Sequence, residues 1–228
     1  MFSFKEIRLS LKNFIQALPD WWRRDFIWNL MAAPVLFIVL MYILSDANIF
    51  GWQDSSVCKN DLEIIHPALL LLTIILSVGG WLKAKDSALL FLGFLAAFFL
   101  IRELLSQTNV STSVVIAGII GLIIYANRDL ERIKTLLNSK WSTSLLGMCF
   151  ICYFISQLFD RGFIKRIWWL VKMDTSLKLP YSSNIEEGLE SLGGFFLVLT
   201  SILLIIHARK RLTAKRDTIV EQKKQDNN

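Results

Sequence analysis

Long runs of apolar residues constrain this chain more than any other feature of its sequence. The clearest run is 185–207, whose last thirteen residues are almost wholly apolar. With the turns before them, these residues are long enough to cross a bilayer. A hydrophobic content of 54% and a mean hydropathy of +0.49 are typical of a membrane protein. Because the apolar runs approach about twenty residues, membrane insertion is favoured over a soluble core.

We predict an all-α integral membrane protein, with a bundle of six transmembrane helices as domain 27–207. The predicted spans are 27–45, 62–81, 87–105, 113–127, 142–160 and 185–207. The N-terminal segment, 1–26, has the pattern of an amphipathic helix that lies in the headgroup plane. The loop 161–184 contains a second amphipathic stretch and is expected to form a short surface helix. The basic tail, 208–228, is expected to be disordered beyond about Asp217.

Lysine and arginine are unevenly distributed between the two sides that these spans define. The side that holds both ends of the chain carries 18 of them, and the opposite side carries 6. By the positive-inside rule, both termini are predicted to be cytoplasmic, as in a multi-pass protein of a bacterial-type inner membrane. Because the basic residues lie between hydrophobic runs and in the tail, the net charge of +6 indicates contact with lipid headgroups and not with nucleic acid.

Ionisable side chains from four spans are predicted to lie at one level, near the non-cytoplasmic surface. A charge inside hydrocarbon costs about 2.5–3.5 kcal/mol on insertion scales, so several together suggest a shared role. We predict that Arg102 and Glu103 pair at the centre of an acidic pocket. The candidates for catalysis are Arg102, Glu103, Glu187 and Glu190. The candidates for binding a ligand or a metal are Glu63, His66, Gln157 and Asp160.

Three interpretations of these residues stay open. In the first, His66 and nearby carboxylates bind a divalent cation that activates water against a lipid or headgroup ester. With one imidazole on that side, such a site favours magnesium, calcium or manganese over zinc. In the second, the pocket binds a cationic or hydroxylated ligand, or a helix of a partner, without chemistry. In the third, the acids are helix-mouth residues in water, with Asn184 as an N-cap and Glu186 and Glu187 in the first turn.

Other features narrow the choice of function. The inner halves of the spans contain no charged residue, which argues against a proton or ion pathway across the membrane. The sequence has no Walker loop, nucleophile-elbow GxSxG or HExxH motif. Cys149 and Cys152 form a CxxC within a span, where packing is expected rather than redox or zinc chemistry. Small residues at 79–80, 117–121 and 193–194 are expected at close helix contacts.

We therefore interpret the chain as a polytopic inner-membrane protein with an outward-facing acidic pocket. The hypothesis is that the pocket binds or processes a lipid or lipid-linked headgroup of the outer leaflet, with a divalent cation as a candidate cofactor. The competing class is a non-enzymatic membrane component, such as an accessory subunit, whose polar cluster is structural or binds a membrane-protein partner. The sequence leaves open whether a reaction is catalysed. The lipid bilayer is an expected partner in both cases.

Overall fold

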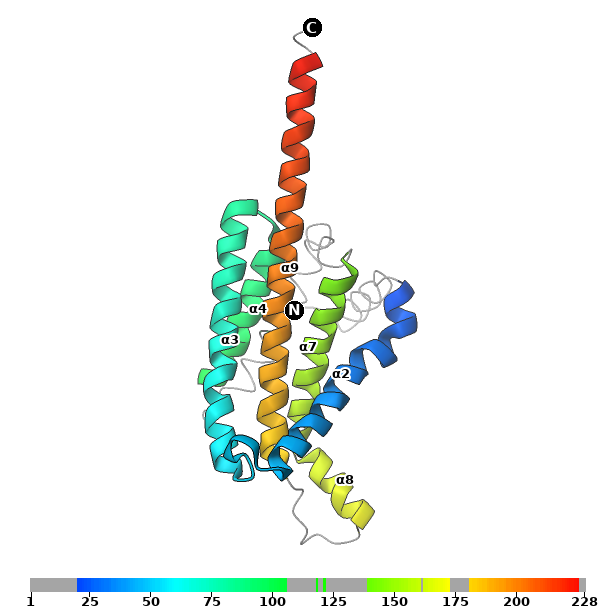
Figure 1. Cartoon of the computed structure of the whole chain (residues 1–228), viewed down its shortest axis with the longest axis vertical. Helices are drawn as coiled ribbons and strands as arrows, with labels where there is room; N and C mark the ends of the chain where they lie inside the picture. Colours follow the sequence, from blue (N-terminus) through cyan, green and yellow to red (C-terminus); the bar gives the residue numbers. More distant parts are fainter. Residues whose placement is uncertain are drawn as a thin grey trace, which may run out of the picture.

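The described part of the chain is all-helical (Figure 1). The computed structural model describes residues 20–105, 118, 121, 139–160, 162–172 and 181–225. The elements in chain order are α2 (Asp20–Asp46), the 3₁₀ turn η1 (Ile49–Gly51), α3 (Ser55–Ala84), α4 (Ser87–Leu104), α7 (Lys140–Asp160), α8 (Phe163–Lys172) and α9 (Ser182–Gln225).

The helices have the length and the surface of membrane spans. Four are long and apolar enough to cross a membrane: Ser56–Ala84, Ser87–Leu104, Lys140–Asp160 and Ser182–Ala214. A shorter apolar helix, Met31–Asp46, precedes them. Large side chains such as Leu36, Ile64 and Phe154 are more than half exposed. So much uncovered apolar surface is unusual in water, whereas in a bilayer it faces lipid. An all-helical, multi-span membrane protein is confirmed at this level.

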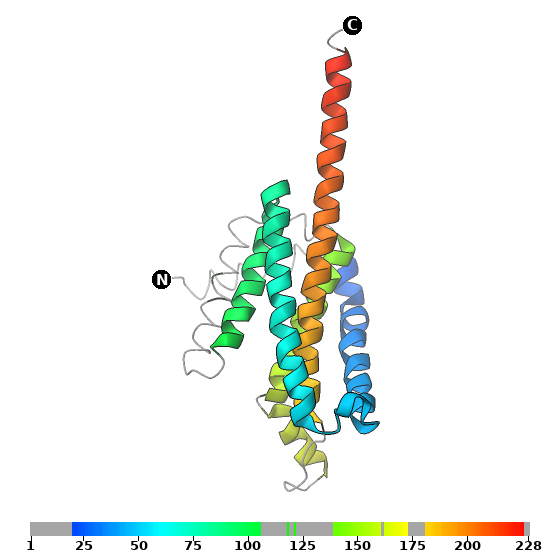
Figure 2. The same cartoon turned by 60° about the vertical axis from the view of Figure 1, so that its left-hand side comes forward.

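Helix α9 is the centre of the bundle. It packs against α2, α3, α4 and α7, and two views show it running among them (Figures 1 and 2). Its buried face includes Leu189, Leu197 and Leu204. The hydroxyl oxygens of Ser77 on α3 and Ser201 on α9 lie 2.9 Å apart, which adds a hydrogen bond between two buried helix faces. The long apolar run that dominates the sequence is therefore also the element on which the others pack.

Helix α3 begins at Ser55, earlier than the predicted span of 62–81. Asp54 caps it, because its carboxylate accepts a hydrogen bond from the backbone N–H of Ser56 at 2.9 Å. Hydrogen bonds from the hydroxyl and the backbone N–H of Ser56 also lower the pKa of Asp54 below its usual value. Helix α4 begins at a similar cap, Asp86. Hydropathy missed the first turns of α3 because they are polar, although an aspartate followed by two serines is a helix-start signal.

The start of α9 is tied to the end of α2. The helix begins at Ser182, so Asn184 lies inside it and is not its N-cap, contrary to the sequence-based expectation. The buried Asn184 side chain donates from Nδ2 to Ser45 Oγ at 2.9 Å and to the carbonyl oxygen of Trp52 at 2.8 Å. These two bonds join α9 to the end of α2 and to the segment around Trp52 that follows η1.

The C-terminal part of α9 projects past the other helices (Figure 1). The structure describes it as helix to Gln225, whereas the sequence analysis expected disorder beyond about Asp217. Lysine, arginine, alanine and glutamine favour helix, and a helix already nucleated in the bundle needs only to propagate. The guanidinium of Arg211 pairs with Asp86 at 2.8 Å, which fixes the first turns of this projection to the α3–α4 turn.

Two predicted elements lie largely outside the described residues. These are the amphipathic segment 1–26, apart from the first turns of α2, and the fourth predicted span, 113–127, apart from Gly118 and Gly121. Both glycines are helical, and Gly118 lies directly against the ring of Phe98 on α4. That contact is typical of a small residue where two helices approach closely.

Two smaller predictions are confirmed. A short helix, as expected within 161–184, is present as α8, which projects from one end of the bundle (Figure 1). Cys149 and Cys152 are free thiols and are fully buried on α7. They therefore fill space between helices, as free cysteines commonly do.

Candidate functional site

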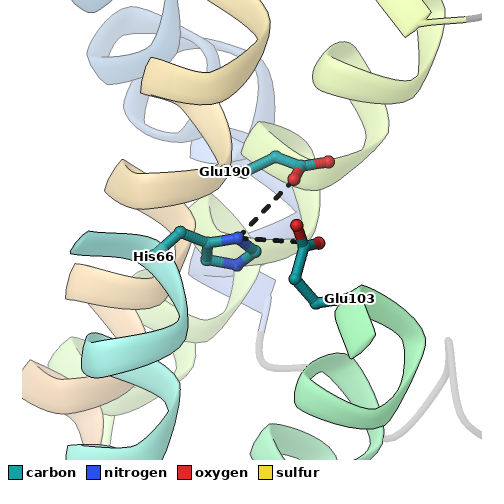
Figure 3. A group of neighbouring side chains, drawn as sticks. All are labelled: His66, Glu103 and Glu190. Carbon is teal, nitrogen blue, oxygen red and sulfur yellow. Dashed lines mark ion pairs between the residues drawn. The ribbon is translucent and has the colours of Figure 1, made fainter. Parts of the chain in front are cut away.

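Polar side chains from four helices meet near one end of the bundle. His66 from α3, Glu103 from α4 and Glu190 from α9 point toward one another, and we call these three residues the His/Glu cluster (Figure 3). One ligand atom from each lies within 4.8 Å of the others. The N-terminal halves of α3 and α9 and the C-terminal end of α4 bring them together. A buried His/Glu cluster is thus confirmed.

The two ring nitrogens of His66 have different surroundings. The side chain is 1% exposed, and its Nε2 lies 2.7 Å from the phenol oxygen of Tyr153. Its Nδ1 has no hydrogen-bond partner in the described part of the chain. Nδ1 faces Glu190 Oε2 at 3.6 Å and Glu103 Oε2 at 3.9 Å. When Nε2–H donates to Tyr153, Nδ1 presents its lone pair to the two carboxylates.

Tyr153 is held in place by packing on both sides. Its ring stacks on Phe99 of α4, with ring centroids 4.3 Å apart. On α9, a Cβ at Gly193 would lie 2.9 Å from the Tyr153 ring, closer than packed carbon atoms approach. A Cβ at Gly194 would lie 3.5 Å from His66 Cδ2, which is ordinary contact. Gly193 is therefore the residue that lets the tyrosine reach the histidine.

Glu190 is oriented by donors from two helices. Its Oε1 accepts hydrogen bonds from Arg102 Nη1 at 3.2 Å, Ser156 Oγ at 2.9 Å and Gln157 Nε2 at 3.4 Å. Three donors occupy this oxygen fully, so Oε2 is left to face His66. The Glu190 side chain is only 6% exposed, and this network is what makes a buried carboxylate tolerable.

The residues of the cluster fit a divalent cation. Glu103 and Glu190 against Arg102 leave one net negative charge beside a neutral imidazole. Adjacent ligands at about 2.1–2.4 Å from one ion stand about 3.0–3.9 Å apart. The distances from His66 Nδ1 to Glu190 (3.6 Å) and Glu103 (3.9 Å) fall in this range, and all three ligand atoms lie within 4.8 Å of one another. Two oxygen ligands and one nitrogen ligand suit manganese or magnesium better than a sulfur-preferring metal. The Glu190 network and Tyr153 supply the outer hydrogen bonds that orient metal ligands.

The structure brings together most of the predicted site residues. His66, Arg102, Glu103, Gln157 and Glu190 lie in or against the cluster. This is the meeting of four helices that the sequence analysis expected. The predicted pairing of Arg102 with Glu103 is wrong, because in the described part of the chain Arg102 pairs with Glu190.

The remaining three are not members of the cluster. Glu63 is 45% exposed and pairs with Lys59 at 3.3 Å, Asp160 is exposed at the end of α7, and the half-buried Glu187 forms no hydrogen bond or ion pair with described residues. Each stands three residues from a member of the site, and that spacing turns a side chain about 60° around the helix.

Sequence reasoning missed Tyr153 and did not count Ser156 among the site residues. Both lie on the face of α7 that carries Gln157, at spacings of three and four residues. That periodicity is the signal by which they could have been found. Tyr153 was not recognised because an aromatic residue within a span more often packs against apolar side chains than forms a hydrogen bond with a polar one.

These observations define a multi-span helical membrane protein with a buried His/Glu cluster. Comparison of the chain with protein-family models, with curated proteins and with solved structures finds no match. Because helical bundles host many functions, the fold does not indicate a function, and the chemistry of the His/Glu cluster is the basis for inferring one.

Proposed function

We propose that this membrane protein binds a divalent cation at the His/Glu cluster and, with Arg102, binds and processes the polar headgroup of a lipid or lipid-linked molecule. The observation that supports this most is Nδ1 of His66, which is buried, without a hydrogen-bond partner in the described part of the chain, and directed at carboxylates from two other helices. A lone pair facing two carboxylates is unfavourable unless a proton or a cation lies between them.

The chemical roles follow from the donor set. His66, Glu103 and Glu190 are the proposed ligands, and three protein ligands leave positions open for water and for an oxygen of the headgroup. When bound, the cation would polarise that oxygen and lower the pKa of the bound water. Arg102 uses one guanidinium nitrogen for Glu190, and its other N–H groups, which form no hydrogen bond with the described residues, are proposed to bind a phosphate or carboxylate.

The headgroup is proposed to approach past the end of α4. The Arg102 and Glu103 side chains are 19% and 22% exposed, whereas His66 and Glu190 are almost fully buried. Arg102 and Glu103 stand in the last turn of α4, which ends at Leu104. An anionic headgroup at the end of a span would therefore meet Arg102 before it reached the buried ligands.

Cation binding is tested by elemental analysis and thermal unfolding of the detergent-purified full chain with Mn²⁺, Mg²⁺, Ca²⁺ and Zn²⁺. A cation present at a hundred times its Kd is expected to stabilise the wild type by about 2.7 kcal/mol. Glu103→Gln, which keeps size and removes one ligand charge, is expected to abolish this gain. Glu63→Gln is the matched control, because Glu63 lies outside the cluster, and it should respond like the wild type. A metal-free wild type that no cation stabilises would contradict the proposal.

A second candidate function is structural. Glu190 Oε1 joins α4, α7 and α9 through Arg102, Ser156 and Gln157, and such a network alone is able to hold three helices in register. In that case the protein is a non-enzymatic component that uses the cluster to fix its fold or to receive a partner. It would then show no response to any cation, and Glu103→Gln would leave its stability unchanged, because the Glu103 carboxylate accepts no hydrogen bond from described residues.

The proposal also includes the membrane orientation, with six spans and both termini in the cytoplasm. The uneven distribution of lysine and arginine supports it. In bacterial cells, green fluorescent protein fused after the last residue is expected to fluoresce, and alkaline phosphatase at that place is expected to be inactive. Fusions placed after residue 48, between α2 and α3, should give the reverse result. Inactive fluorescent protein at the C-terminus would contradict this orientation.

A further inference from the structure

A cleft lies between α3 and α9, away from the His/Glu cluster. Its volume is about 230 Å³, and its residues on α3, from Ile75 to Ala84, lie about 14–27 Å along that helix from His66. Ile75, Leu76 and Ile205 are among its apolar walls. Lys83 and Arg209, both exposed, also line it. The cleft is therefore apolar along its walls, with two cationic side chains beside it near the ends of two spans.

Two neighbouring glycines have different roles here. A Cβ at Gly80 would lie 2.7 Å from Ile205 Cγ1, so this glycine allows α3 and α9 to pack closely. A Cβ at Gly79 would meet no atom within 4 Å, although Gly79 lines the cleft. The missing side chain at Gly79 thus leaves space that the packing of the helices does not need.

The charges around the cleft are not neutralised by the described residues. Lys83 and Arg209 form no ion pair with them, and the nearby acid, Asp86, is already paired with Arg211 and caps α4. Two cations beside an apolar channel, at the end of membrane spans, complement a negatively charged headgroup attached to an acyl chain. A zwitterionic headgroup fits less well, because its own ammonium group would be repelled.

We propose that the cleft binds one anionic glycerophospholipid of the bilayer, with an acyl chain between α3 and α9 and the phosphate beside Lys83 and Arg209. The lipid would complete the contact between the two helices that carry His66 and Glu190. This site is independent of the proposed cation site, because it shares no residue with the His/Glu cluster.

Native mass spectrometry of the full chain in detergent tests the proposal, using phosphatidylglycerol and phosphatidylcholine with identical acyl chains. The wild type is expected to retain one phosphatidylglycerol in preference to phosphatidylcholine. Lys83→Gln and Arg209→Gln should each lower that preference about fivefold, and together about thirtyfold. Lys210→Gln is the control, because Lys210 is a neighbouring exposed cation outside the cleft, and it should leave the preference unchanged.

Filling the cleft is the second arm of the test. Gly79→Leu is expected to abolish retention of both lipids, whereas Val78→Leu, next to the cleft but not lining it, should retain them. Thermal unfolding checks that each variant is folded. If Gly79→Leu does not fold, the Lys83 and Arg209 variants test the proposal by themselves. Equal retention of the two lipids by the wild type, an equal effect of Lys210→Gln, or a dimer that Gly79→Leu dissociates in place of a lipid would each overturn the proposal.

Discussion

Replacing Glu190 with alanine is expected to destabilise the folded protein by about 3–5 kcal/mol. The change removes the ion-pair partner of Arg102, whose side chain is only 19% exposed, and leaves a charge without compensation inside the bundle. It also removes the acceptor for the Ser156 hydroxyl and the Gln157 amide. Unfolding of the purified protein in mixed detergent micelles, followed by helical circular dichroism, measures the loss.

Glu63→Ala provides the matched control for Glu190. Its carboxylate pairs with Lys59, but both side chains are nearly half exposed, so the loss is expected to be below about 1 kcal/mol. In the Glu190→Ala background, Arg102→Met should recover part of the stability, because the uncompensated charge is then removed. Similar losses for Glu190→Ala and Glu63→Ala would show that the buried ion pair does not stabilise the bundle.

Gly193→Leu is expected to destabilise the protein by at least about 1–3 kcal/mol, the usual cost of overfilling a packed interior. Even a Cβ at this position would lie 2.9 Å from the Tyr153 ring, which stacks on Phe99 and has little room to retreat. Displacing Tyr153 would also release Nε2 of His66. The variant is therefore expected to lose both stability and the response to cations, as measured by thermal unfolding with and without Mn²⁺.

Gly79→Leu separates this effect from the general consequences of putting leucine in place of a helical glycine. The space at Gly79 is open, so the stability of this variant should remain within about 0.5 kcal/mol of the wild type or rise slightly. A Gly193→Leu variant that unfolds like Gly79→Leu and still responds to cations would show that the Tyr153 position does not depend on this glycine.

The order of the helices and their membrane character could be predicted from the sequence, because both depend on long apolar runs. The span predicted as 185–207 lies at the centre of the bundle, and α4 was placed to within one residue. The ends of helices were predicted less well. The polar first turns of α3 and the charged last turns of α9 lie outside the apolar section, where hydropathy gives no signal and capping and propensity decide.

The candidate site could be predicted to the level of the helix but not to the level of the helix face. Sequence spacing grouped Glu63 with His66 and Glu187 with Glu190, yet Glu63 pairs with Lys59, and neither Glu63 nor Glu187 is a member of the cluster. The rotation of a helix about its axis is set by its neighbours, for example by Gly193 receiving the ring of Tyr153. Contacts of that kind depend on residues far apart in sequence, and a single chain without coordinates does not reveal them.

The central position of α9 has a consequence for how the protein is made. Helices α2, α3, α4 and α7 precede α9 in the sequence, so the ribosome delivers them to the membrane before it. In insertion that accompanies synthesis, His66 and Arg102 would reach the bilayer before Glu190 has been synthesised. Until α9 is inserted, the polar groups of the earlier helices lack their final partner. We therefore expect them to stay near water or against an insertion factor until the bundle assembles.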